Sequence, residues 1–220
     1  MTHLPRKEQK RRGHFLIEFA IVTPLLATLL FGVTDVGMIL TTANTVSQVC
    51  RNANVLVVRG IDMSTAANQS LLMRTAQGLG LNQAGTYTPD PNGKGVIYLT
   101  KVMLVGPNEC NAGITNWDQK PADCPNYNQY VIASYLAIGN STQWVSPIGK
   151  PATTVQSNGS LYDSDIATNT GNRAKGFGAG GAITLTLDQY TFVSEVYVSG
   201  VGLDVFHMFT QPFIHMRNLT

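Results

Sequence analysis

A single carboxylate, Glu18, lies in a run of apolar residues that extends from His14 to Thr34. As a helix, these 21 residues would be about 31 Å long, which is enough to cross the hydrocarbon core of a bilayer. A charged side chain in that core is costly, and such side chains are usually paired with a partner. The apolar run therefore predicts a membrane span whose one acidic residue needs a cation nearby.

Basic residues precede this run. Residues 1–13 hold five basic side chains and one acid, whereas the rest of the chain holds ten basic and twelve acidic side chains. Basic residues beside a membrane span usually stay in the cytoplasm, so we expect a cytoplasmic leader (1–13), a transmembrane segment (14–35) and an exported remainder. Without interleaved aromatic residues, nucleic-acid binding is disfavoured. A cleaved secretory signal would be shorter and end in a small-x-small site, and a plain uncleaved anchor gives no role to Glu18.

The residues around Glu18 resemble the class III signal of type IV pilins, because Gly13 follows two arginines and precedes "HFLIE". The resemblance implies that a membrane-embedded prepilin peptidase cuts after Gly13 and leaves a new α-amino group on His14. That amine is largely cationic at neutral pH. The resemblance also implies that Glu18 pairs with the amine of a neighbouring subunit, since a packed helix without this contact would hold an unpaired buried charge.

The longer string "RRGHFLIEFAIVTPLLATLLFGVTDVGM" resembles the TadE family of minor pilins or pseudopilins from tight-adherence (Flp-type) pilus systems. The resemblance rests on a basic pair before a glycine, Glu18-Phe19, Pro24, a leucine-rich stretch, Phe31-Gly32 and Asp35, with a weaker echo in "FVSEVYVSG" near the C-terminus. It implies a structural protein of pilus assembly or adhesion. The implied partners are the prepilin peptidase, other pilin or pseudopilin subunits, the inner-membrane assembly platform and the membrane. The implied location is the bacterial inner membrane, with a cytoplasmic N-terminus and a periplasmic C-terminal domain, or a surface pilus.

The helix is expected to continue beyond the membrane. Apolar residues recur there at alternating spacings of three and four and form one seam, which consists of Val36, Ile39, Ala43, Val46, Cys50, Ala53 and Val57. This period predicts an extramembrane helix over residues 36–60 that ends at Arg59-Gly60 and packs on the protein's own head or on a neighbouring helix. Cys50 in the seam is interpreted either as a small buried hydrophobe or as an intersubunit bridge.

The remaining residues, 61–220, predict an α+β head in which the long N-terminal helix packs on a small antiparallel sheet. Residues 64–78 indicate a short helix capped by Ser64. The runs 96–105 and 130–138 are apolar on both faces, which favours central strands. A third alternating run starts at Ile183 and changes phase at Asp188-Gln189, where we expect a bulge or a turn. The polar segment 139–182 is expected to form a surface loop, and the apolar tail from residue 204 is either a strand pair or a docking segment.

Two cysteines bracket a polar segment of the head. Cys110 and Cys124 are 14 residues apart, and an exported domain lies in an oxidising compartment, so we expect a disulfide. Closing a loop of this size stabilises a fold by about 3 kcal/mol.

The sequence shows no catalytic or cofactor motif. The cysteines and histidines lack zinc-ligand spacing, and the glycines at 176–181 are not followed by the helix that a phosphate-binding loop needs. We therefore expect no cofactor, no metal and no enzymatic activity. Two alternatives remain open: an uncleaved single-pass protein with a periplasmic binding domain, and a membrane-anchored hydrolase whose pocket would have to bring histidine and acidic groups together.

Overall fold

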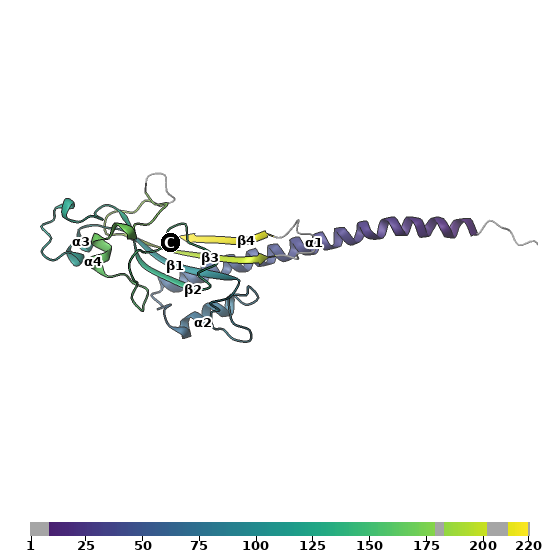
Figure 1. The fold of residues 1–220 in the computed structure, drawn as a ribbon, viewed down its shortest axis with the longest axis horizontal. Coiled ribbons are helices and arrows are strands. Elements are labelled where there is room, and N and C mark those ends of the chain that lie inside the picture. The colour runs from purple at the N-terminus through teal and green to yellow at the C-terminus, as the bar shows by residue number, and fades with distance from the viewer. Residues whose placement is uncertain (1–8, 179–182, 202–210, 220) are drawn as a thin grey trace, which may run out of the picture.

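The structure is a computed structural model that describes residues 9–178, 183–201 and 211–219. One long helix carries a compact head at its C-terminal end and projects far beyond it (Figure 1). Most of the basic leader and the start of the C-terminal tail, residues 202–210, lie outside the described residues.

Helix α1 (Gln9–Val58) contains 50 residues, and Pro24 lies inside it. Its length is about 75 Å at 1.5 Å per residue. The helix ends at Val58, and Gly60, the expected stop residue, follows it with φ +74°. The N–H of Gly60 donates to Val57 O and that of Ile61 to Leu56 O, so two carbonyls of the last turn are satisfied by the following backbone.

The head is built on a four-stranded antiparallel sheet in the order β2-β1-β3-β4. The strands are β1 (Gly95–Leu104), β2 (Tyr130–Gly139), β3 (Tyr190–Val201) and β4 (Gln211–Leu219). The expected α+β architecture, with a long apolar helix packed on a small antiparallel sheet, is confirmed. The tail forms the edge strand β4, which pairs with β3 from Val193↔Leu219 to Val201↔Gln211.

Two strand predictions are wrong. Strand β2 is an edge strand rather than a central one, and it is buried because residues 159–161 and 173–174 bond to its outer edge instead of a fifth strand. Residues 183–187 form no strand; the chain turns at Asp188, which has φ +66°, and β3 begins two residues later. This turn confirms the bulge or turn expected at Asp188-Gln189. A separate bulge lies at Lys101/Val102, where the register between β1 and β2 shifts.

Three shorter helices complete the head. Helix α2 (Ala66–Thr75) is capped by Thr65, which accepts a hydrogen bond from Asn68 N–H, and not by Ser64 as expected. Helices α3 (Pro107–Gly113) and α4 (Asp163–Thr168) lie at the end of the head farthest from the N-terminus (Figure 1). Because α4 and several buried residues lie within 139–182, including Ile148 and Leu161, this segment is not the surface loop that was expected.

The sheet has an apolar core on each face. On one face α1 and α2 cover the sheet, and the seam residues from Ile39 to Val57 all belong to this core. On the other face the core is closed by the loops between residues 105 and 178 rather than by a second layer of helices. Both cores therefore lie at the level of the C-terminal half of α1, and the described part of the head does not cover its N-terminal half.

Candidate functional site: the bare half of α1 and its anchor in the head

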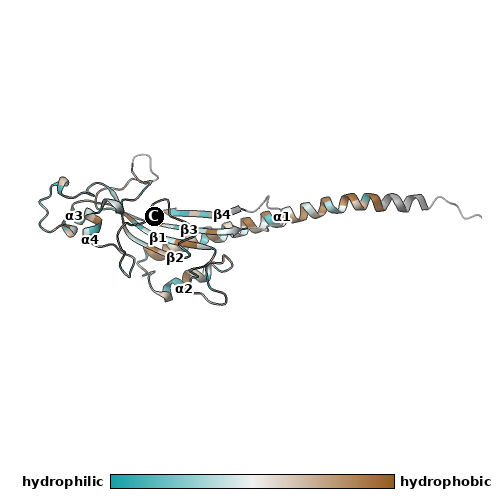
Figure 2. Cartoon of the chain, viewed as in Figure 1, coloured by the Kyte–Doolittle hydropathy of each residue, from teal (hydrophilic) through white to brown (hydrophobic). Residues whose placement is uncertain are grey.

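The N-terminal half of α1 is an uncovered apolar helix. Its large apolar side chains from Leu16 to Val33 are all exposed, between 45% and 72%, and Figure 2 shows the hydrophobic colouring concentrated along this part of the helix. By length and composition the helix can cross a membrane. An exposed apolar surface of this extent is unfavourable in water and marks a site of contact with lipid or with other apolar helices.

Between Leu16 and Thr34, where the structure describes the side chains, the polar groups satisfy their own hydrogen bonds, with one exception. The hydroxyls of Thr23, Thr28 and Thr34 donate to backbone carbonyls of the preceding turn, at 2.7–2.8 Å. Glu18 is exposed, and among the described residues it forms no hydrogen bond or ion pair. The carboxylate is therefore available to a group outside the described part of the chain.

The residues expected at the cleavage site lie within the same helix. Gly13 and His14 are in the second turn of α1, five and four residues before Glu18. Seventeen residues, or about 26 Å along the helix axis, separate Glu18 from Asp35. Asp35 is only 4% exposed and is the first buried side chain met along the described helix. The apolar, uncovered stretch is thus bounded by one exposed carboxylate and one buried one.

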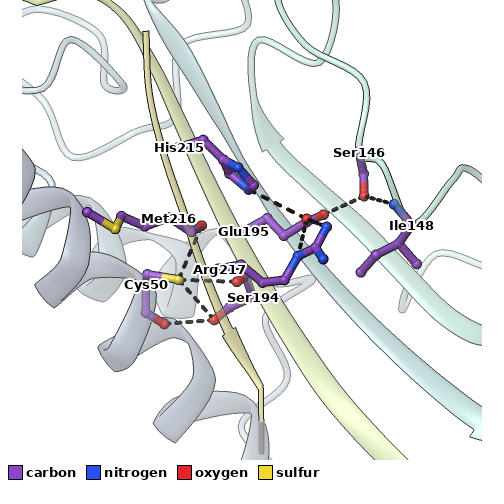
Figure 3. Close-up of polar contacts among 8 residues, drawn as sticks. All are labelled: Cys50, Ser146, Ile148, Ser194, Glu195, His215, Met216 and Arg217. Carbon is purple, nitrogen blue, oxygen red and sulfur yellow. Dashed lines mark hydrogen bonds and ion pairs between the residues drawn. The ribbon is translucent and has the colours of Figure 1, made fainter. Parts of the chain in front are cut away.

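The C-terminal half of α1 is anchored to the sheet by Cys50. The Cys50 thiol lies 3.1 Å from Ser194 O and 3.6 Å from Met216 O, and Ser194 Oγ donates back to Cys50 O at 2.8 Å. Figure 3 shows these bonds tying the helix to both β3 and β4. Burial raises the pKa of the Cys50 thiol, and the thiol is free and buried. In this structure Cys50 is a packed core residue, and a bridge to another subunit would have to expose it.

A buried charge cluster, which the sequence did not predict, lies on the opposite face of β3. Glu195 is completely buried, and its Oε1 accepts hydrogen bonds from Arg217 Nε at 2.8 Å and Nη2 at 2.6 Å. Its Oε2 accepts a bond from Ser146 Oγ, and His215 Nε2 lies 3.6 Å from Oε1 (Figure 3). This cluster joins β3 to the edge strand β4 and to the loop that follows β2.

Opposing effects set the ionisation of Glu195. Burial alone would raise the pKa of its carboxyl group, but hydrogen bonds from His215, Ser146 and Arg217 outweigh it, so the pKa lies below its ordinary value. The ring of His215 stacks on Tyr197 at 4.2 Å between centroids. Glu195 is enclosed by these donors, which come from β4 and from the loop after β2, so it joins three segments of the head.

Cys110 and Cys124 form a disulfide, with their Cα atoms 5.9 Å apart. It closes the loop after α3, in which Trp117 Nε1 donates to Lys120 O at 2.9 Å. Among the described residues there is no cluster of three or more metal-ligating side chains. One pocket is lined by Lys101, Glu109 and Asp163, and no histidine lines any of three pockets formed by the described residues.

A bare apolar helix, followed by a continuous extension that packs on an antiparallel sheet, defines an α+β protein with one described helix that is able to cross a membrane. The family comparison agrees: residues 13–53 match the model of the family described as TadE-like protein, which confirms the resemblance seen in the sequence. The match begins at Gly13 and includes Glu18, Asp35 and Cys50. Comparison with curated proteins and with solved structures gives no match. The match covers 41 of the 220 residues and lies entirely within α1.

Proposed function

We propose that the chain is a minor pilin or pseudopilin of a tight-adherence (Flp-type) pilus, processed by a prepilin peptidase and active in pilus assembly or adhesion. The observation that supports this function best is the uncovered apolar half of α1 with a single unpartnered carboxylate, Glu18. Lipid can cover the apolar side chains, but it offers the carboxylate no matching cation.

The peptidase supplies that cation. Cleavage after Gly13 leaves a protonated α-amine on His14, near the start of the helix. In the inner membrane a carboxylate at this depth costs about 3 kcal/mol on insertion scales. Pairing with the amine of a neighbouring subunit removes part of this cost, so assembly is favoured only after processing. The leader 1–13 remains in the cytoplasm and the head, 61–220, lies in the periplasm.

The N-terminus of the protein recovered from its native membrane tests this function. Mass spectrometry is expected to find a mature chain that starts at His14 and to find the leader retained in a Gly13→Val variant. Glu18→Gln is expected to be cleaved normally and to lose co-purification with pilus subunits. Asp118→Asn, which neutralises an exposed carboxylate at the far end of the head, is the matched control.

Two results contradict the proposal. An intact N-terminus in the native membrane would favour an uncleaved single-pass protein with a periplasmic binding domain. A cleaved Glu18→Gln variant that still co-purifies with the other subunits would remove the pairing role of the carboxylate. If the Asp118→Asn control is cleaved and co-purifies normally, the loss of one negative charge does not by itself explain a loss of co-purification in Glu18→Gln.

A further inference from the structure

The end of the head nearest the bare half of α1 is formed by the loop between α2 and β1. Helix α2 runs back along α1 toward the membrane side, and residues 76–94 then lead into β1 (Figure 1). A pocket of about 200 Å³ separates this loop from α1 and is lined by Met38 and Thr42 of α1, by Gly80 and Lys94 of the loop, and by Gly200 at the end of β3. The loop therefore lies level with residues 38–42 of α1.

This level begins at the outer margin of the headgroup layer of a bilayer. A span of about 20 residues that starts at His14 ends near residue 34. Residues 38–42 follow it by about 6–12 Å, and the headgroup region extends roughly 5–7 Å beyond the hydrocarbon on each side. Val36, Met38 and Leu40 are still 50%, 38% and 60% exposed there. The head thus does not begin to enclose α1 fully until the helix has left the hydrocarbon.

Two cations and an aromatic residue lie in or beside this loop: Arg74 in the last turn of α2, Tyr87 within the loop and Lys94 at its end. We call these three residues the membrane-facing rim. The guanidinium of Arg74 lies 5.0 Å from the centroid of the Tyr87 ring, and Tyr87 is 39% exposed. Lys94 is exposed, and its aliphatic chain crosses Gly80, where a Cβ atom would come within 3.2 Å of Lys94 Cδ. Long cationic side chains and tyrosine are typical of membrane–water interfaces.

Neighbouring acids do not neutralise the rim. Neither Arg74 nor Lys94 forms an ion pair within the described ranges of the chain. The acid of the same loop, Asp90, is half-buried and accepts a hydrogen bond from the N–H of Asn92 at 2.9 Å. Asp35 on α1 is buried. Asp204, between β3 and β4, lies outside the described residues.

We propose that the membrane-facing rim binds the phosphate groups of anionic lipid headgroups in the bilayer that holds α1, so that the head rests on the membrane surface. The proposal depends on the membrane anchoring of α1, because the helix brings the rim to its target. The charge of the rim is complementary to anionic lipid. The rim also adjoins the segment of α1 that emerges from the hydrocarbon. Each cation near an anionic membrane surface favours the membrane-bound position of the rim roughly fivefold.

Hydrogen exchange of the full-length protein in lipid nanodiscs tests the proposal. Amides of residues 76–94 are compared in discs of phosphatidylcholine and in discs that also contain phosphatidylglycerol. We expect exchange to be about 25-fold slower in the anionic discs, and this protection to disappear in an Arg74→Gln/Lys94→Gln variant. The control is Lys120→Gln/Lys175→Gln, which removes two exposed cations at the opposite end of the head.

Three outcomes overturn the proposal. The first is equal exchange in both kinds of disc, and the second is equal loss of protection in the control variant. The third is protection by inorganic phosphate in phosphatidylcholine discs, which would indicate an anion site and not a lipid surface. The wild-type chain gives a further measurement that needs no variant, because high salt screens exposed charges and is expected to abolish the protection. Failure of the protein to co-elute with discs would refute the membrane anchoring itself, whereas co-elution without protection would refute only the rim.

Discussion

The Glu195–Arg217 pair gives the most quantitative test of how the head is held together. Substitution of Arg217 by methionine keeps most of the apolar stem and removes the two hydrogen bonds to Glu195 Oε1. Loss of one partner from a fully buried pair destabilises a protein by about 3–5 kcal/mol, because it leaves a buried charge uncompensated. The Arg217 side chain is 35% exposed, so water can reach part of the site and we expect the smaller loss of about 2–3 kcal/mol.

Thermal unfolding in nanodiscs measures this loss. For a chain of this size, it corresponds to a melting temperature about 5–10 °C lower. The double variant Glu195→Gln/Arg217→Met is expected to melt above Arg217→Met, because it removes the stranded charge together with its partner. The control is Lys120→Met, which breaks the exposed ion pair with Asp118 at 3.5 Å and is expected to change the melting temperature by about 1 °C at most.

The pH dependence of stability tests whether ionised Glu195 stabilises the folded head. The pKa of Glu195 is lowered in the folded state, so its contribution to stability is present above its unfolded pKa and is lost as the pH falls through the lower folded value. The difference in melting temperature between wild type and the double variant is therefore expected to narrow below about pH 4. Equal melting temperatures of Arg217→Met and the wild type at neutral pH would show that the Glu195–Arg217 pair does not stabilise the pairing of β3 with β4.

Three other predictions concern the remaining ionisable and cysteine groups. Replacement of both Cys110 and Cys124 by serine is expected to lower the free energy of unfolding by about 3 kcal/mol, measured by denaturant titration against the reduced wild type. Burial and the neighbouring Asp188 carboxylate raise the pKa of Glu109, so the folded state is destabilised as the pH rises through that pKa and the carboxyl group ionises. The melting temperature of Glu109→Gln is therefore expected to be higher than that of the wild type at pH 7. At acidic pH the two melting temperatures are expected to be equal. Cys50 is expected to resist labelling by maleimide in the folded protein and to react once the protein is unfolded, since its thiol is buried and its pKa raised. Rapid labelling of the folded protein, or a disulfide-linked dimer, would instead favour the interpretation of Cys50 as an intersubunit bridge.

The long helix was predictable because its signal is local. The seam repeats every three or four residues from Ile39 to Val57, and the helix period alone assigns these positions to one face. Strand β1 was predicted for a related reason, since its apolar run is bounded by glycines at 95 and 106. Such patterns depend on neighbours within a few residues, so they can be recognised without knowledge of the fold.

The position of a strand in the sheet was not predictable from the same pattern. Strand β2 is apolar on both faces, but its cover at the outer edge comes from Gly159, Leu161 and Ala174, which are distant in sequence. Residues 183–187 alternate as a strand would, yet β1 ends at Leu104 and the chain turns into α3 at Gly106, so they have no partner to pair with. Both errors arise because an apolar run indicates that a segment is buried, but it does not indicate which part of the protein covers that segment.

The Glu195 cluster was missed for a similar reason, although one signal was present. A glutamate in the apolar strand "FVSEVYVSG" indicates either a buried pair or a functional acid. Its partner Arg217 lies 22 residues away on another strand, and no local spacing identifies it. The sequence thus marks the acid as unusual, and only the antiparallel register of β3 and β4 shows which cation compensates it.

The two halves of α1 place different demands on specificity. In the C-terminal half, Cys50 and the rest of the seam fit one surface of the head, where close packing and directed hydrogen bonds distinguish the correct arrangement from others. In the bare half, apolar side chains gain little by exchanging lipid for another helix, because lipid tails are as apolar as leucine. Discrimination between lipid and a neighbouring subunit must therefore come from a group that lipid cannot satisfy. In the described part of that half, from Leu16 onward, the threonine hydroxyls are already bonded to the backbone and Glu18 is not, which is why our proposal assigns the selectivity of assembly to Glu18.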